Sequence, residues 1–535
     1  MSQRPNIIIF NPDEMRADTL SHLGNPAAVT PNLDRFAQTD AVSFSNAFCQ
    51  NPVCVPSRCS FFTGLYPHVH GHRTMTYLLH EDEPSLLKEL KDSGYYVWMN
   101  DRNDLIAGQV PGLVESQVDE IFYSGQSAPG PIENLRGEPG NKNYYSHYDG
   151  KLGLDANGKN YTNDDAAVDA AIERLTHPVD DRPVCIFLGL MYPHVPYAVE
   201  DPYFSSIDRA KLPARITADT CSHKAKILSD IRKYQHMEDY TEEDWNELRA
   251  TYLGMCMKID EQFGRLTDAM KKNGSYDNSA IFFFSDHGDF TGDYDLTEKA
   301  QNSFEDCLTK VPFLIKPPAD VPTDPGICPS LTELIDFYAT VTDFADILPS
   351  HTQFGKSLRQ ILADRSMEQR NYVFCEGGRM PDETHCDEFH ESGPNGLSPR
   401  VAYWPKNMAQ TDPVAHAKGI MIRDHHYKYI SRTLGSDEFY DLSIDPEEKI
   451  NRIEDAAYLP QIYKMKDAML KWLEGTADVV PYQLDSRFTP EMIFARAKSH
   501  ASPEDYDLIK EKIASGASFV EVMQFARESG QKHRS

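Results

Sequence analysis

Short runs of apolar, β-branched and aromatic residues recur along the first two-thirds of the chain, each bounded by polar or turn-forming residues. Runs of this length are typical of buried strands in a parallel sheet. Several of the segments between them carry apolar residues at helical spacing. The predicted strands are NIIIF at 6–10, GYYVWM at 94–99, PVCIFLGL at 183–190, SAIFFF at 279–284 and VPFLIK at 311–316, and the predicted helices are 31–40, 54–66, 84–93, 165–176 and 241–273. This alternation predicts an α/β fold with a mainly parallel sheet.

The pattern changes after about residue 370, where a loop-like stretch precedes segments at 418–442 that are typical of antiparallel strands. Residues 455–475 and 487–530 have the character of helices. The region 110–165 is rich in Gly, Pro, Asn and Tyr, so we expect a long surface insertion there. The predicted organisation is an N-terminal domain at 1–375, a subdomain with a small antiparallel sheet at 376–480 and a helical C-terminal extension at 481–535.

Acidic residues outnumber basic residues by a wide margin. The 535 residues include 82 Asp and Glu against 53 Lys and Arg, a formal net charge of −29. That charge argues against nucleic acid and anionic membranes as partners, because both attract clusters of Lys and Arg. It permits an anionic small substrate, since a local cationic pocket can outweigh a distant negative surface. No apolar run has the length of a membrane span and none precedes the first strand, so we expect a cytoplasmic protein.

Polar side chains follow two of the predicted strands directly. Asp13 and Glu14 come after the first strand, and Asp286 and His287 come after SAIFFF. Oxygen-rich ligands at separate strand ends suit a divalent cation such as Ca²⁺, Mg²⁺ or Mn²⁺. The alternative for each acid alone is a helix cap or a turn.

The segment CVPSRCSFFTGLYPHVHG at 54–71 resembles the signature of the type I, formylglycine-dependent sulfatases of the alkaline phosphatase superfamily. In that signature the cysteine of C-x-P-x-R, here Cys54, is oxidised to formylglycine. For Cys54 alone, the alternative is an ordinary buried thiol. Five further segments resemble landmarks of the family in the same order: TPNLDRFA at 30–37, SDHGD at 285–289, FEDCLTKVPFLI at 304–315, GKSLRQIL at 355–362 and EFYDLSIDPEEKINRI at 438–453.

The resemblance implies an alkaline-phosphatase-like fold, with a large mixed, mostly parallel sheet between helices and a smaller C-terminal subdomain carrying an antiparallel sheet. It also implies that a gem-diol at modified Cys54 attacks the sulfur of a sulfate monoester and passes through a covalent sulfo-enzyme intermediate. The implied cofactor is one divalent cation, Ca²⁺ before Mn²⁺ or Mg²⁺. The metal site implied is Asp13, Glu14, Cys54, Asp286 and His287.

Further roles follow from the same resemblance. Arg58 would hold the nucleophile, while His194, in a P-H-x-P segment, and Lys299 would contact the sulfate and the leaving group. Surface or structural roles are the alternatives for all three. His68, His70 and His72 alternate along the chain; His70 is the one expected to face the substrate, and a histidine metal site is the alternative.

The chain departs from the family at one motif. Where the family commonly has G-K-x-H, this sequence places Arg102 and Asp104, which we assign to substrate binding. Related phosphonate monoester hydrolases depart at the same position. Two alternatives therefore stand beside the sulfatase: a phosphonate monoester or phosphodiester hydrolase, and a catalytically silent protein that binds a sulfated ligand.

The expected partners are a small sulfated substrate and a formylglycine-generating enzyme. The helical extension is expected to cover either a neighbouring subunit, giving a homo-oligomer, or the mouth of the site. The insertion at 110–165 and the loop at 376–400, which includes Glu388 and His390, are expected to shape specificity.

Overall fold

The computed structural model describes residues 4–383, 398–480 and 487–532. The chain forms two compact units, Met1–Val479 and Val480–Ser535. Glu388 and His390, named above for specificity, lie outside the described residues. None of the helices that the structure describes is long and apolar enough to cross a membrane.

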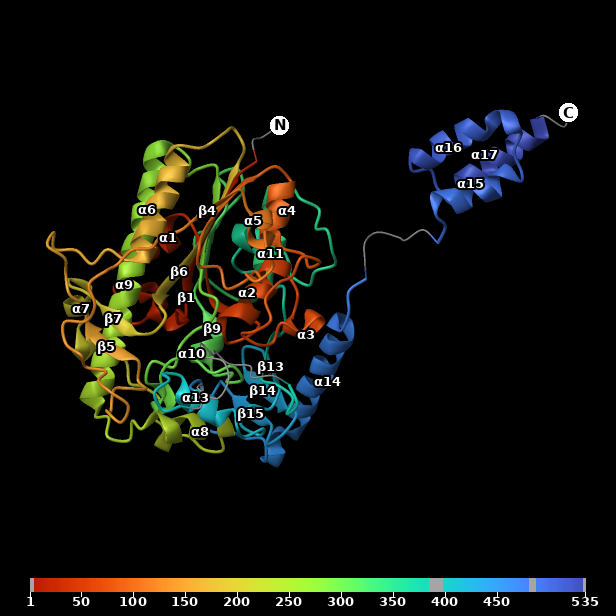
Figure 1. The fold of residues 1–535 in the computed structure, drawn as a ribbon. Helices are drawn as coiled ribbons and strands as arrows, with labels where there is room; N and C mark the ends of the chain where they lie inside the picture. Colours follow the sequence, from red (N-terminus) through yellow and green to blue (C-terminus); the bar gives the residue numbers. More distant parts are fainter. Residues whose placement is uncertain (1–3, 384–397, 481–486, 533–535) are drawn as a thin grey trace. The chain divides into compact units, whose positions relative to one another are not determined.

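The larger unit is built on a nine-stranded mixed sheet within the described residues (Figure 1). Its strand order is β11-β2-β10-β8-β1-β6-β3-β4, with β9 paired to β2. The strands are β1 (Asn6–Asp13), β2 (Val42–Phe48), β3 (Tyr96–Asn100), β4 (Glu120–Phe122), β6 (Val184–Pro193), β8 (Ser279–Phe284), β9 (Lys310–Val311), β10 (Phe313–Lys316) and β11 (Gly326–Glu333). The predicted mostly parallel sheet is confirmed, since β1 pairs in parallel with both β6 and β8.

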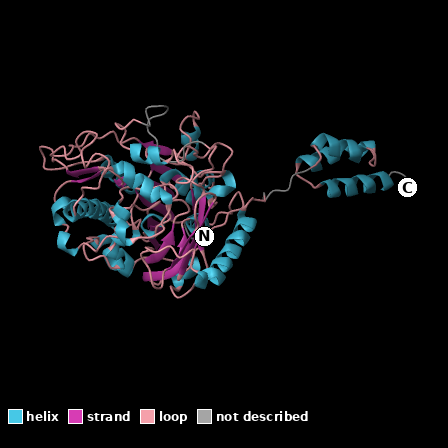
Figure 2. Cartoon of the chain, turned by 90° about the horizontal axis from the view of Figure 1, so that it is seen from below, coloured by secondary structure: helices cyan, strands magenta, loops and turns pink. Residues whose placement is uncertain are grey.

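Alternate residues of the central strands face opposite layers of helices, so each strand carries a continuous apolar run. Ile7 and Ile9 lie in one buried cluster, and Ile8 and Phe10 lie in the other. Figure 2 shows the strands running between helices. The helices that pack in the first cluster include α2 (Cys54–Thr63), α4 (Leu86–Asp92) and α11 (Ile335–Ala345), and those that pack in the second include α1 (Pro31–Thr39), α6 (Asn163–Thr176) and α9 (Glu242–Asn273).

Further elements complete the larger unit. The antiparallel sheet expected near the end of the chain has the order β12-β13-β14-β15. The elements are α3 (Pro67–His70), α5 (Leu113–Gln117), β5 (Tyr148–Lys151), β7 (Tyr197–Val199), α7 (Tyr203–Ser206), α8 (Lys226–Gln235), α10 (Asp306–Thr309), α12 (Arg359–Ala363), β12 (Val373–Gly377), α13 (Trp404–Ala409), β13 (Gly419–Arg423), β14 (Tyr427–Arg432), β15 (Glu438–Asp441) and α14 (Leu459–Thr476).

The C-terminal unit is a small helical domain with its own core. It contains α15 (Pro490–Lys498), α16 (Tyr506–Ala514) and α17 (Phe519–Lys532). Ile493, Ile509 and Val522, one from each helix, are buried together. The expectation of a helical C-terminal segment agrees with this unit, and its role in assembly stays a prediction.

The structure differs from the sequence pattern at four strands. β2 and β11 were not predicted: β2 alternates polar and apolar residues, and β11 contains Pro329, which an edge strand tolerates because it needs fewer ladder bonds. The VPFLIK segment forms β10, which runs antiparallel to both of its neighbours. Part of the predicted insertion, β4, joins the sheet beside β3, and its three residues are too short to show a pattern.

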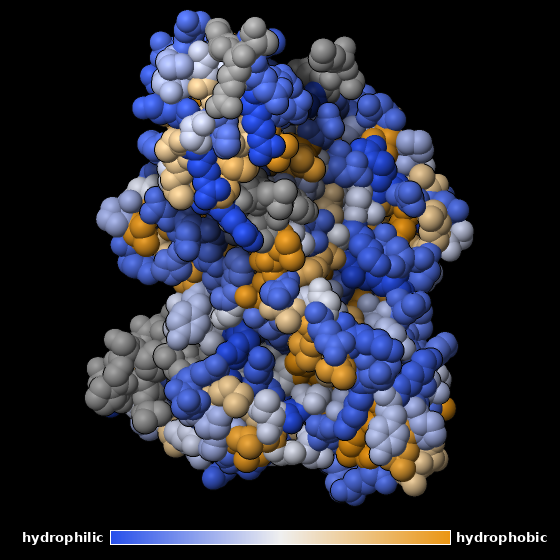
Figure 3. Space-filling view, turned by 90° about the vertical axis from the view of Figure 1, so that its right-hand side faces the viewer, coloured by the Kyte–Doolittle hydropathy of each residue, from blue (hydrophilic) through white to orange (hydrophobic). Residues whose placement is uncertain are grey.

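On the face shown in Figure 3, hydrophilic residues predominate and apolar residues appear in small separate groups.

Candidate active site

The candidate site lies where three neighbouring parallel strands end. Because β1 lies between β6 and β8, the loops that leave their carboxyl ends converge. Asp13 is the last residue of β1, His194 directly follows β6, and Asp286 comes two residues after β8. All three side chains are buried. The topology thus brings together polar residues that are up to 273 positions apart in sequence.

Cys54 enters this region as the first residue of α2. Pro56 is tolerated there because the first turn of a helix has no intrahelical partners for its N–H groups. All ten residues of α2 are buried, and the helix stops at Gly64, whose φ of 70° is left-handed. A side chain at Gly64 would also meet Gln353 Cβ at 2.9 Å. A buried helix therefore presents Cys54 at its amino end, where the backbone favours negative charge.

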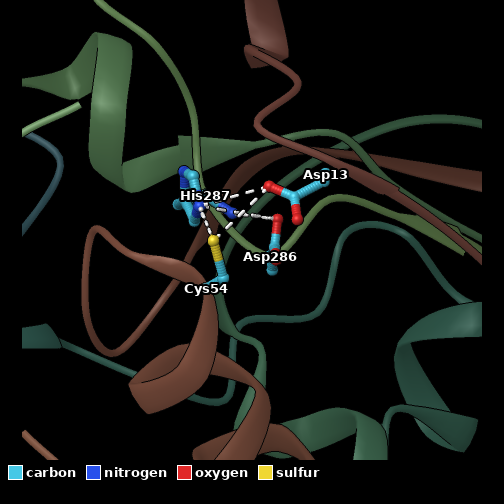
Figure 4. Close-up of side chains that lie close together, drawn as sticks. All are labelled: Asp13, Cys54, Asp286 and His287. Carbon is cyan, nitrogen blue, oxygen red and sulfur yellow. Dashed lines mark hydrogen bonds and ion pairs between the residues drawn. The ribbon is translucent and has the colours of Figure 1, made fainter. Parts of the chain in front are cut away.

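Cys54, Asp13, Asp286 and His287 form a compact cluster (Figure 4). His287 Nε2 lies 3.3 Å from Cys54 Sγ and 3.5 Å from Asp13 Oδ1. Cys54 Sγ is 3.6 Å from Asp13 Oδ1. One ligand atom of each of the four residues lies within 4.8 Å of the others. The cluster has the compactness that a single cation requires.

Two arginines hold the carboxylates of this cluster. Arg58 Nη2 donates to Asp13 Oδ2 at 2.8 Å, and Arg58 Nε donates to Asp286 Oδ2 at 2.9 Å. Arg102 Nη2 donates to the same Asp13 oxygen. Burial raises the pKa of Asp13, but Arg102 and Arg58 outweigh it, so the pKa lies below its ordinary value. The planar guanidinium of Arg58 thus fixes two carboxylates at once.

Glu14 joins a second polar group beside the first. Its Oε2 lies 3.2 Å from Lys299 Nζ and 3.4 Å from His194 Nε2. Lys299 Nζ also lies 2.9 Å from His194 Nε2. Glu14 has a left-handed φ of 67°, a conformation held by its N–H bond to Asp286 Oδ1 and by Tyr252, which donates to its carbonyl oxygen. Burial raises the pKa of Glu14 against the attraction of Lys299.

The residues present fit a divalent cation. His287 Nδ1 lies 2.9 Å from Gly288 O, so it donates there and leaves the Nε2 lone pair facing Cys54 and Asp13. Burial lowers the pKa of His287, which favours the neutral form that a metal needs. Glu14 Oε1 is buried and has no hydrogen-bond partner among the described residues. The donor set of two or three carboxylates and one imidazole suits Ca²⁺, Mg²⁺ or Mn²⁺.

The three residues predicted to bind substrate lie in different settings. Arg102 keeps 24% of its side chain exposed, and Asp104 keeps 34%. Asp104 Oδ2 lies 3.3 Å from Arg102 Nη2 and 3.9 Å from Arg58 Nη1. These two residues therefore form the partly open side of the cluster. His70, in contrast, contacts Glu83, with 3.1 Å between Nδ1 and Oε1, and its substrate role stays a prediction.

Lys406 is a member of the site that the sequence did not reveal. It comes from α13, is buried, and forms an ion pair with Glu298, the neighbour of Lys299. Burial lowers the pKa of Lys406 to about 7, against the attraction of Glu14 and Asp289. No motif surrounds Lys406, so only the packing of α13 brings this cation to the site.

Tyr197 and Asp289 fix the loop that carries Lys299. The Tyr197 hydroxyl lies 2.8 Å from Asp289 Oδ1 and accepts a hydrogen bond from the N–H of Glu298 at 2.8 Å. Asp289 belongs to the SDHGD segment, so the sequence pointed to it as a residue near the site. No motif pointed to Tyr197.

Comparison with known proteins identifies the family. The sulfatase family model matches residues 5–347. An arylsulfatase of Clostridium perfringens is 24% identical over 511 residues, covering 88% of this chain and 95% of that protein. A choline-sulfatase of Rhizobium meliloti is 25% identical over 479 residues, covering 84% and 83%.

The fold has solved counterparts as well. The phosphonate monoester hydrolase of Agrobacterium radiobacter superposes with a TM-score of 0.69 at 22% identity, covering 90% of this chain and 97% of that one. At that identity the likeness concerns the fold. The match of the family model over most of the chain is the stronger result: the chain belongs to the sulfatase family, whose members are hydrolases of sulfate esters.

Proposed function

We propose that the protein cleaves a small sulfate monoester, with Cys54 as the precursor of its nucleophile. One observation carries the proposal. Cys54 Sγ lies 3.3 Å from His287 Nε2 and 3.6 Å from Asp13 Oδ1 at the amino end of a buried helix. A reacting group at this position would meet a cation, a helix dipole and the arginine pair together, which suits an anionic transition state.

Two groups would complete the site. A divalent cation, which we propose is Ca²⁺, would be held by Asp13, Asp286 and His287 and would neutralise charge on the sulfate. A formylglycine-generating enzyme would supply the oxidant that converts the Cys54 –CH₂–SH group to an aldehyde, whose hydrate offers a hydroxyl nucleophile in place of sulfur. Arg58 keeps the acceptor oxygens of Asp13 and Asp286 in place for that chemistry.

The proton for the departing alcohol would come from the Lys299–His194 pair. His194 Nδ1 lies 2.8 Å from Val195 O and donates to it, so Nε2 accepts from Lys299 Nζ. Along that bond a lysine proton can pass to His194 Nε2, which then donates it to the leaving oxygen; alternatively, another N–H of the Lys299 ammonium can donate to that oxygen directly. Arg102, partly exposed at the edge of the cluster, would bind a sulfate oxygen.

Replacing His194 with alanine tests this assignment. We expect kcat to fall by roughly 10²-fold or more for sulfate esters of alkyl alcohols, which need a proton as they leave. Aryl esters with acidic leaving groups should lose much less. Rates measured over a series of leaving-group pKa values check the prediction, and an equal loss across the series would assign His194 to binding alone.

A phosphonate monoester or phosphodiester hydrolase is the second candidate. Arg102 and Asp104 replace the Lys and His that the family commonly carries, and two arginines converge on Asp13 Oδ2. Turnover of an aryl sulfate and of the matching aryl phosphonate separates the two. We expect a higher kcat/KM for the sulfate, and the opposite order would establish the alternative.

Mass spectrometry of the peptide that contains Cys54 decides whether the nucleophile exists. The protein should be made in its own host or with a formylglycine-generating enzyme. We expect the mass of the aldehyde or its hydrate. An unmodified thiol under these conditions, with no turnover but with binding of a sulfated ligand, would favour the catalytically silent alternative.

We also propose that the C-terminal helical unit supports a homo-oligomer. Its three helices have their own core, so a truncation before residue 485 should leave the larger unit folded. The mass of the truncated and full-length proteins in solution checks this. An unchanged oligomer after truncation would reject the role.

A further inference from the structure

A second group of metal-ligating side chains lies at the end of α3 and in the loop that follows it, and none of its residues belongs to the catalytic cluster. It consists of His70, His72 and Glu83, with one ligand atom of each within 4.8 Å of the others. His72 Nε2 lies 2.6 Å from Glu83 Oε1, and His70 Nδ1 lies 3.1 Å from the same oxygen. Both imidazoles therefore direct a ring nitrogen at one carboxylate oxygen.

The backbone at Gly71 explains why the two histidines meet. Gly71 ends α3 with a left-handed φ of 81°, and a Cβ there would meet nothing within 4 Å. Glycine is thus favoured for its conformation and not for lack of space. The turn brings His70 and His72 together, with ring centroids 6.4 Å apart. An extended strand would also place His70 and His72 on one side, because alternate residues of a strand share a face. It would not explain why both rings contact Glu83 Oε1.

Two backbone contacts orient these side chains from behind. His72 Nδ1 lies 2.8 Å from the Tyr77 carbonyl oxygen, to which it donates, so Nε2 is the atom that faces Glu83. Glu83 Oε2 accepts a hydrogen bond from the His80 N–H at 2.8 Å. A histidine whose second nitrogen is fixed by a carbonyl is the usual arrangement around a bound metal.

The group is accessible to an ion from solvent. It lines a hollow of about 560 Å³ whose wall also includes Tyr77, His80 and Asp82. His70 keeps 30% of its side chain exposed, while His72 and Glu83 keep 10% and 13%. A hydrated ion can therefore enter from the His70 side and meet ligands that are already positioned.

We propose that His70, His72 and Glu83 form a second metal site that takes a transition metal ion of the Zn²⁺ type. Two imidazoles and one carboxylate, with a water in the remaining position, are a common ligand set for zinc. The set differs from the oxygen-rich catalytic cluster, which suits harder cations. The two sites should therefore prefer different ions.

Binding at this site would exchange a proton for the ion. His72 Nε2 lies 2.6 Å from Glu83 Oε1, so a proton is shared between these two atoms and the ion must displace it. The N–H bond breaks, the N–metal bond forms and the proton passes to water. Calorimetry of Zn²⁺ binding in buffers of different ionisation enthalpy should therefore show proton release.

The loop that carries this site is joined to the wall of the catalytic cluster. The Leu79 N–H donates to the Leu105 carbonyl oxygen at 2.8 Å, and the Ala107 N–H donates to the Leu79 carbonyl oxygen at 3.0 Å. Leu105 directly follows Asp104. An ion that crosslinks residues 70, 72 and 83 would therefore stabilise the segment beside Asp104 and Arg102.

Zinc content per chain tests the proposal. Full-length protein freed of metal is dialysed against micromolar Zn²⁺, comparing wild type with His70→Ala and Glu83→Gln. The matched control is His177→Ala, because His177 Nδ1 lies 2.9 Å from Glu173 Oε1 in a surface pair that has no third ligand in the part of the chain that the structure describes. We expect the wild type and the control to hold one more equivalent of zinc per chain than His70→Ala or Glu83→Gln, or to bind that zinc at least about 10-fold more tightly.

Two further readouts separate this site from the catalytic cluster. Asp286→Asn should keep the additional zinc equivalent, and Zn²⁺ should raise the Tm of the wild type but not of Glu83→Gln. If His70→Ala and Glu83→Gln bind as much zinc as the wild type and gain the same Tm, the three residues form only a hydrogen-bond network and the proposal fails. His70 is partly exposed, so His70→Ala should fold and decides the matter if Glu83→Gln does not.

Discussion

Replacing Cys54 with alanine should abolish turnover while the fold remains. We expect kcat to fall by at least about 10⁴-fold, because loss of a nucleophile leaves only binding and electrostatic effects. The change removes one sulfur from a buried position and leaves Asp13 and Asp286 bonded to Arg58. Steady-state rates with an aryl sulfate, together with thermal unfolding, measure the two effects separately.

Cys59→Ala is the matched control for this variant. Cys59 lies in the same helix, is equally buried at 1% exposure, and is not part of the catalytic cluster. It should lose a similar amount of stability and keep most of the activity. Full activity in Cys54→Ala, or an equal loss in both variants, would remove Cys54 from the mechanism.

Asp286→Asn should weaken cation binding and slow turnover together. The amide keeps the shape of the carboxylate but removes its negative charge, which attracts both a bound cation and Arg58. Replacing a residue that hydrogen-bonds to a metal ligand typically lowers metal affinity about 10–100-fold. We expect replacement of a direct ligand to lower the affinity by at least about 100-fold. Rates measured against Ca²⁺, Mg²⁺ and Mn²⁺ concentration should show partial recovery at high metal.

Asp289→Asn controls for the loop itself. Asp289 lies three residues further on and is buried. Its carboxylate contacts Tyr197 and Thr291 rather than the residues of the catalytic cluster. Its replacement should change stability more than metal dependence. If Asp286→Asn has the metal dependence of the wild type and differs only in Tm, the carboxylate has a structural role.

Much of the fold followed from local pattern. The central strands were predicted because both of their faces are buried, which makes NIIIF and SAIFFF apolar at every position after the first. The edge strand β11 was missed for the opposite reason, since an edge accepts Pro329 and exposed residues. The antiparallel direction of β10 was also beyond the pattern, because the direction of a strand depends on the path of the chain around it.

The candidate site shows the same division. Asp13, Cys54, Asp286 and His287 stood out because they occupy strand ends or a motif, and the structure brings them together. Lys406 did not stand out in the sequence, because its short helix carries no motif. Its burial beside Glu298 results from tertiary packing alone.

The sequence by itself determined the α/β class, the resemblance to sulfatases and the strand ends that carry ligands. These depend on residue type and spacing over short distances, where burial and motif chemistry restrict the choice. Only the tertiary structure decided which partner each side chain meets. The contact of His70 with Glu83, for example, results from the turn at Gly71 and the return of the chain, while the substrate role expected for His70 stays a prediction. Such contacts depend on how distant segments pack, and no local pattern records that.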